Sequence, residues 1–88
     1  MAGMTGMNIE QVRALSQQLN QAADQVRQIA GDLSSKLGST TWVGQDQARF
    51  TSDWESSHRP SLTKVAEALA HASQLASQNA AEQERTSA

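Results

Sequence analysis

The sequence predicts an all-α fold in which two long helices form an antiparallel hairpin. Apolar residues recur with helical spacing in two long stretches that are separated by a short segment bounded by glycines. Ala and Gln are frequent in both stretches, whereas the strand-favouring Tyr is absent and Phe occurs once. Because short connections between helices produce antiparallel neighbours, we expect a hairpin that occupies residues 1–88 as a single domain with flexible termini.

The first helix is expected over residues 8–37. Asn8 followed by Gln11 forms a capping-box pattern that places Asn8 at the N-cap. Leu37 followed by Gly38 predicts the end of the helix, with Gly38 just beyond it in a left-handed conformation.

Apolar residues of this helix fall into rows with a seven-residue repeat. The first row is Val12, Leu19, Val26 and Leu33, the second is Leu15, Ala22 and Ile29, and a third is Ile9, Ser16, Ala23, Ala30 and Leu37. Two rows would suit a two-stranded coiled coil. Three rows indicate a bundle helix that contacts more than one neighbour.

The connector is expected over 38–44 and the second helix over 45–82. Phe50 and Trp54 lie four residues apart on one face of that helix, and the spacing resumes at the leucines and valine that follow, namely Leu62, Val65 and Leu69. Pro60 conflicts with a straight helix, because its ring clashes with the carbonyl four residues back. The helix either kinks there or divides into two helices, 45–58 and 60–82. We favour the kink because the apolar spacing continues past Pro60.

An isolated hairpin of this kind cannot cover its own apolar rows. The chain has 88 residues and no Cys, so neither a disulfide nor a thiolate metal site stabilises it. We therefore expect two hairpins to associate into a four-helix bundle, as a homodimer or as a heterodimer with a related hairpin. The residues expected in the hairpin and dimer core are Val12, Leu15, Leu19, Val26, Ile29, Leu33, Phe50, Trp54, Leu62, Val65 and Leu69.

The composition excludes several classes of function. The net charge of −2, without a basic stripe, argues against nucleic-acid binding. No stretch reaches the roughly 20 apolar residues of a membrane span, and the polar faces lack the Lys and Arg that favour membrane binding. The N-terminus shows no cleavable signal peptide. With no nucleophile elbow, metal-ligand cluster or deep pocket expected, we predict no enzyme activity, no metal and no cofactor.

The tripeptide Trp42-Val43-Gly44 lies in the connector between the two predicted helices. In a chain of this length without a leader, this arrangement resembles the WXG-motif family of early-secreted-antigen-like substrates of type VII secretion systems. The resemblance covers residues from Asn8 to about Glu84. It implies dimeric helical hairpins that are cytoplasmic before export, are secreted without a cleavable signal peptide, and are recognised by a secretion ATPase.

The resemblance also implies a role for the motif itself. In the family, the turn of one subunit packs near the C-terminal export signal of its partner, and Trp42 and Gly44 match the turn residues of that surface. Two structural interpretations remain open beside this one. Trp42 would serve as a hydrophobic plug at the end of the hairpin, and Gly44 would be a position that requires positive φ.

The C-terminal region departs from the family pattern. Many members carry a Tyr-x-x-x-Asp/Glu export signal, and this chain contains no Tyr. Either another signal serves, or a partner chain supplies it, or this chain is not the recognised subunit.

Three functions follow from these observations. The leading hypothesis is a small secreted substrate or export partner of a type VII secretion system that acts through protein–protein interaction. The alternative is a cytoplasmic helical adaptor or chaperone that pairs with a larger secreted toxin. A third hypothesis is a membrane-active effector that exposes its apolar rows after the dimer dissociates.

Overall fold

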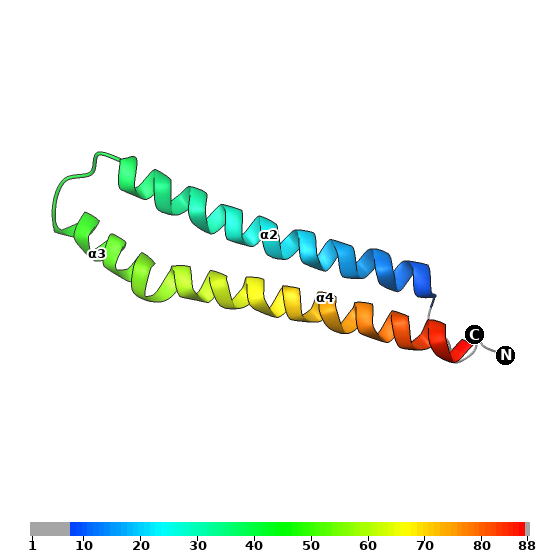
Figure 1. Cartoon of the computed structure of the whole chain (residues 1–88). Helices are drawn as coiled ribbons and strands as arrows, with labels where there is room; N and C mark the ends of the chain where they lie inside the picture. Colours follow the sequence, from blue (N-terminus) through cyan, green and yellow to red (C-terminus); the bar gives the residue numbers. More distant parts are fainter. Residues whose placement is uncertain (1–7, 88) are drawn as a thin grey trace.

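The computed structural model describes residues 8–87 and shows a long helical hairpin. Helix α2 (Ile9–Ser39) runs in one direction. Helix α3 (Gln45–Asp53), the π-helical turn η1 (Trp54–His58) and helix α4 (Arg59–Ser87) return beside it as one continuous helical run. Both ends of the described chain lie together, opposite the connector (Figure 1). The predicted all-α hairpin is confirmed, and residues 8–87 contain no strand.

The molecule is a rod only two helices thick. Its extents are 67 × 17 × 17 Å, and the smaller dimensions match one or two helix diameters. Such a shape has little interior, and within the described residues no large side chain is fully buried. No helix in this part of the chain has the length and apolar character needed to cross a bilayer.

The two ends of α2 are set by local side chains. The Asn8 carboxamide oxygen accepts a hydrogen bond from the backbone N–H of Gln11 at 3.0 Å, as expected of an N-cap. The expected end at Leu37 is wrong by two residues, because Gly38 remains helical and the helix ends at Ser39. The Ser39 and Thr40 hydroxyls both donate to the Lys36 carbonyl. These bonds satisfy a carbonyl oxygen in the last turn of the helix. In many helices a glycine in the left-handed conformation allows the backbone to satisfy such carbonyl groups instead.

Helix α4 extends to Ser87, beyond the expected end near Glu82. Contacts with α2 continue into this last part of α4, since Ala80 is fully buried. In addition, the Arg13 guanidinium donates to the Glu84 carboxylate at 2.8 Å. These tertiary contacts extend the helix past the point where the apolar pattern fades. The expected flexible leader, 1–7, lies outside the described residues.

Small side chains form the line of contact between α2 and α4, which we call the helix seam. Its buried members recur every seven residues on each helix: Ser16, Ala23 and Ala30 on α2, and Ala66, Ser73 and Ala80 on α4. Side chains of this size permit a short distance between helix axes. The α2 part of the helix seam is the third row of the sequence, and the two rows of larger residues lie beside it.

Two serines form a reciprocal hydrogen-bonded pair within the helix seam. The Ser16 hydroxyl donates to the Ser73 carbonyl at 2.8 Å, and the Ser73 hydroxyl donates to the Ser16 carbonyl at 2.7 Å. The two hydroxyl oxygens lie 3.1 Å apart. Each buried hydroxyl therefore has a partner on the opposite helix, which fixes the alignment of α2 against α4.

Helices α3 and α4 meet at the π-helical turn rather than at a break. The helical run bends where α3 passes into α4 (Figure 1). The turn ends at His58, two residues before Pro60. The chain is therefore not divided into two separate helices around Ser56-Ser57-His58, and the structural adjustment to Pro60 is a widened helical turn.

Candidate protein-interaction surface

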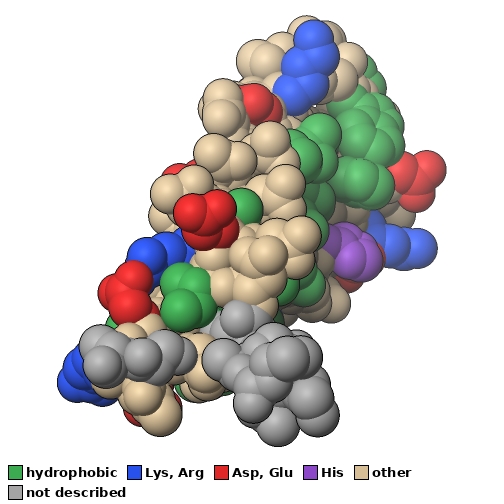
Figure 2. Space-filling view, turned by 90° about the vertical axis from the view of Figure 1, so that its right-hand side faces the viewer, with side chains coloured by type: hydrophobic (Ala, Val, Ile, Leu, Met, Phe, Trp, Pro, Cys, Tyr) green, Lys and Arg blue, Asp and Glu red, His purple; other side chains and the backbone are tan. Residues whose placement is uncertain are grey.

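Large aliphatic side chains lie beside the helix seam, where they form what we call the apolar face. On both helices these residues stand three positions after, or one or four positions before, a helix seam residue. Because α2 and α4 are antiparallel, equal offsets place both sets on the same side of the hairpin. Figure 2 shows hydrophobic side chains gathered along one side of the molecule.

Several residues of the apolar face keep a large part of their surface exposed. Leu15, Ile29 and Leu33 on α2 and Val65 on α4 are 48–52% exposed. The remaining members are intermediate in burial: Val12, Leu19, Val26, Leu62 and Leu69. Neighbouring exposed aliphatic residues make the apolar face a candidate surface for binding another molecule.

The opposite side of the hairpin is polar. An open groove there is lined by the serine pair of the helix seam and by amides and a further serine, including Asn20, Gln74 and Ser77. The hairpin is thus amphipathic across its width, and only one of its two broad sides is suited to hydrophobic association.

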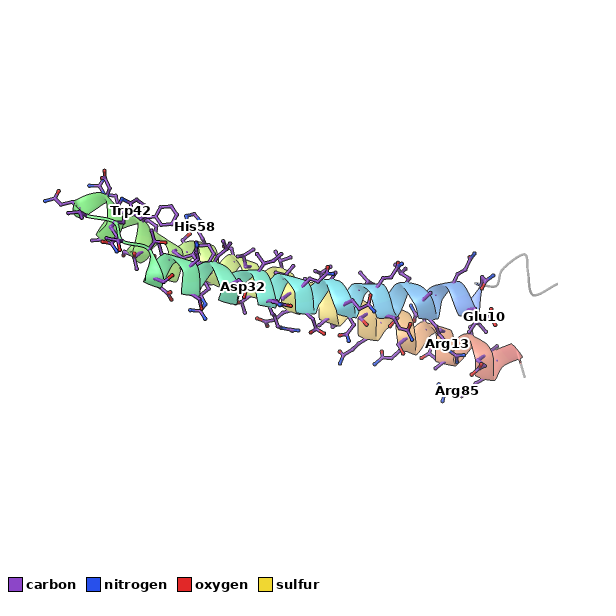
Figure 3. The ribbon with its side chains drawn as sticks, turned by 90° about the horizontal axis from the view of Figure 1, so that it is seen from above. Glu10, Arg13, Asp32, Trp42, His58 and Arg85 are labelled. Carbon is purple, nitrogen blue, oxygen red and sulfur yellow. The ribbon has the colours of Figure 1, made fainter. Side chains whose placement is uncertain are left out.

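Three aromatic side chains gather at the connector end of the hairpin, and we call them the turn cluster: Trp42, Phe50 and Trp54. Trp54 is 9% exposed, and its indole N–H donates to the Ser34 hydroxyl on α2 at 2.8 Å. The rings of Trp42 and Phe50 are 5.3 Å apart and inclined by 51°, which is a favourable tilted arrangement. Trp42 stands at this end of the molecule, far from Arg13 at the other (Figure 3).

The turn cluster encloses one side of an open apolar pocket of about 260 Å³. Leu33 and Leu37 of α2 form the other side, and Lys36 and Thr40 contribute its polar atoms. Its volume is below the range of about 300–1,000 Å³ typical of cofactor and drug-sized ligand sites. The pocket is suited to one or two apolar side chains of a protein partner, and Leu33 makes it continuous with the apolar face.

Gly44 determines how the connector enters α3. It is the N-cap of α3 and has φ 112° and ψ −178°, a region accessible almost only to glycine. A Cβ at this position would meet no atom within 4 Å, so the requirement for glycine comes from the backbone and not from crowding. The neighbouring Val43 is 90% exposed, and Trp42 is 36% exposed. The Trp42 side chain is therefore partly accessible at the tip.

The structure distributes the expected core residues over two environments. Of these residues, only Trp54 is buried within the hairpin. Phe50 joins the turn cluster and remains 48% exposed, and the aliphatic residues make up the apolar face. Within the hairpin itself, the core consists instead of the small residues of the helix seam.

Sequence reasoning did not assign Lys36 or Ser34 to the site. Lys36 follows Leu15, Ala22 and Ile29 at the same seven-residue spacing, so the row could have indicated its place at the pocket. Ser34 has no comparable sequence signal, because its role depends on the position of Trp54 across the hairpin.

Comparison with known proteins finds relatives among the extracellular proteins of type VII secretion systems. Relatives include the type VII secretion system extracellular protein A of Staphylococcus aureus strains USA300, Newman and COL. Each is 37% identical over 68 residues, a match that covers 75% of this chain and 69% of the relative. No family model and no solved structure matches the chain. On the strength of this identity and coverage, the chain belongs to the family of the type VII secretion system extracellular protein A.

Proposed function

We propose that this protein is a secreted substrate, or an export partner, of a type VII secretion system and acts by binding other proteins. The observation that carries the proposal is the apolar face, on which Leu15, Ile29, Leu33 and Val65 remain about half exposed. The name of its relatives, extracellular proteins of that system, supports the secretory role. The proposed function requires no catalysis, metal or cofactor.

The apolar face is best covered by a second helical hairpin. A related hairpin, or a second copy, would present a surface of the same length and the same aliphatic character. Two such hairpins packed face to face would form a four-helix bundle. Obligate interfaces of this kind typically bury about 2,000 Å² or more, and folding would then be coupled to association.

One substitution on the apolar face tests this association. We expect Ile29→Glu to prevent it, because a carboxylate would be buried without a partner. The matched control is Gln28→Glu, which adds the same charge at the adjacent exposed position. Light scattering and circular dichroism across a concentration series would measure mass and helicity together.

The outcomes separate the possible partners. A helical dimer of the parent chain alone indicates a homodimer, and an aggregated or unfolded product that folds on addition of a related hairpin indicates a heterodimer. A parent chain that is a folded, cooperative monomer at micromolar concentration would contradict both forms of the proposal.

The proposed recognition surface for export is the connector, with Trp42 and Gly44 as its motif. Trp42 is partly exposed beside an apolar pocket, which suits contact with a partner terminus or with a secretion ATPase. We expect Trp42→Ala to reduce secretion in a reporter strain while the mass of the purified assembly stays unchanged. Equal secretion of variant and parent would remove Trp42 from the recognition surface.

Localisation tests the broader proposal. Fractionation of a producing strain should find the protein outside the cell, with an intact mass that shows no removal of a signal peptide. Disruption of the secretion ATPase should retain the protein in the cytoplasm. Retention in the cytoplasm of a strain with a working secretion system would instead support an adaptor or chaperone.

A further inference from the structure

The helical run contains a widened turn next to its proline. In η1 the Arg59 N–H donates to the carbonyl of Trp54, five residues back, whereas an α-helix bonds four residues back. Pro60 follows directly, has no N–H and would clash with the carbonyl four residues back in a regular helix. The Ser61 hydroxyl donates to the Ser57 carbonyl at 2.8 Å, so a side chain also bonds to the backbone at this turn.

The widened turn changes the direction of Trp54, its first residue, relative to α2. Trp54 and Ala66 are both buried and stand 12 positions apart. In an uninterrupted α-helix, 12 residues turn about 120° beyond three full turns, whereas 11 residues turn only about 20° beyond them. A regular helix would therefore direct Trp54 about a third of the circumference away from the helix seam. The π-helical turn accommodates the additional residue and brings Trp54 back toward α2.

We propose that Pro60 is a positioning residue that maintains the π-helical turn and thereby aims Trp54 at α2. The rotation brings the Trp54 indole to Ser34, where the observed hydrogen bond is 2.8 Å. Phe50 stands one helical turn before Trp54 and rotates with it, which places its ring beside Trp42. Pro60 thus acts on the pocket from a distance, since it is not among the residues that line it. The part of this inference that concerns export rests on the proposed role of the connector.

Two variants distinguish a rotational effect from a general loss of stability. Pro60→Ala allows the turn to relax to an α-helix, and the Trp54 indole then moves away from Ser34. Pro60→Ala combined with deletion of Ser57 places Trp54 and Ala66 only 11 positions apart in the sequence. A regular helix then restores the original direction of Trp54. Lys64→Ala, at an exposed position of α4, is the control for an alanine substitution in the helix.

The measurement is hydrogen exchange of the Trp54 indole N–H in the intact chain, with its resonance assigned from a Trp42→Phe variant. We expect Pro60→Ala to lower its protection about tenfold, the effect of losing one hydrogen bond. The combined variant should return it to within about twofold of the parent, and Lys64→Ala should leave it unchanged. Unchanged protection in Pro60→Ala, or failure of the deletion to restore it, would overturn the inference.

Secretion of the same variants separates this inference from the proposed function. If the connector is the recognition surface, Pro60→Ala should reduce secretion and the combined variant should recover it. Lowered and restored protection without any change in secretion would retain the positioning role of Pro60 and contradict the recognition role of the connector. Unchanged protection contradicts the positioning role whatever secretion does.

Discussion

The helix seam and the turn cluster hold the same two helices together by different means. The helix seam runs along the shaft and consists of alanines and serines, so the helices approach closely but bury little apolar surface per residue. The turn cluster concentrates three aromatic rings at one end, where Trp54 alone buries more area than several alanines. Alignment thus comes from the shaft, and the tip adds the one large side chain that is buried among the described residues, Trp54.

This division also accounts for the apolar face. Because the positions between the helices are occupied by small residues, the larger Leu, Ile and Val side chains lie beside the helix seam, and several of them remain about half exposed. A sequence that placed its largest residues between α2 and α4 would separate the helices and leave less apolar surface for a partner. The small residues of the helix seam therefore make the apolar face available.

The largest expected effect is at the turn cluster. Trp54→Ala should lower the free energy of unfolding by about 3–5 kcal/mol, because it removes a buried ring and leaves the Ser34 hydroxyl without its partner. Trp42→Ala should cost less, since its ring is already 36% exposed. Urea unfolding followed by circular dichroism compares the two. Equal losses would show that the cluster acts as a unit without a dominant member.

Overpacking the helix seam should have a smaller effect. Ala23 is fully buried, and Ala23→Leu should destabilise the hairpin by about 1–3 kcal/mol, because the new side chain forces the helices apart. Ala14→Leu, at an exposed position of the same helix, should change the free energy of unfolding by less than about 0.5 kcal/mol. Similar values for the two variants would contradict the close approach of α2 and α4.

Two glycines should respond to alanine in opposite directions. Gly44→Ala should destabilise the connector by about 1–3 kcal/mol, since the positive φ of 112° is retained only with strain. Gly31→Ala should stabilise the protein by about 1 kcal/mol, because Gly31 is helical and alanine favours helix. A Cβ meets no atom within 4 Å at either position. If the two substitutions change stability in opposite directions, the difference therefore comes from backbone conformation and not from crowding. A loss of stability at both positions would contradict this explanation.

The smallest expected effect depends on pH and concerns the open end of the hairpin. The hydrogen bond and positive charge of Arg13 hold the pKa of Glu84 below its ordinary value. The stability from this pair is present above the unfolded-state pKa of Glu84 and is lost as the pH falls through the lower, folded-state pKa. Both side chains are about half exposed, so solvent and salt weaken the effect.

The protection of amides near Arg13 against hydrogen exchange, expressed relative to the intrinsic exchange rate at each pH, should therefore fall in acid in the parent chain. Glu84→Gln removes the titrating group, so protection in that variant should already be lower at neutral pH and should change less on acidification. High salt should reduce the difference between the two proteins. An identical pH response would show that the pair does not hold this end of the hairpin.

Local features of the chain were predictable from the sequence. The cap at Asn8 depends on residues within one turn, and the start of the second helix at Gln45 follows a glycine that the sequence itself marks. The helix ends were less predictable. Ser39 and Thr40 bond to Lys36 where Gly38 alone was expected to end the helix, and Glu84 extends α4 by pairing with a residue distant in sequence.

By itself, the sequence determined that this protein is a pair of long amphipathic helices, because a seven-residue apolar repeat satisfies one periodicity only. Tertiary structure alone decided which row lies between the helices. Hydrophobicity alone would place a row of valines and leucines between the helices rather than Ser16, Ala23 and Ala30. Close helix packing and the hydrogen bonds of Ser16 with Ser73 instead favour the row of small residues at that position. It also decided the direction of Trp54, since Pro60 was compatible with either a kink or a break, and the sequence alone does not indicate the π-helical turn after which the Trp54 indole reaches Ser34 across the hairpin.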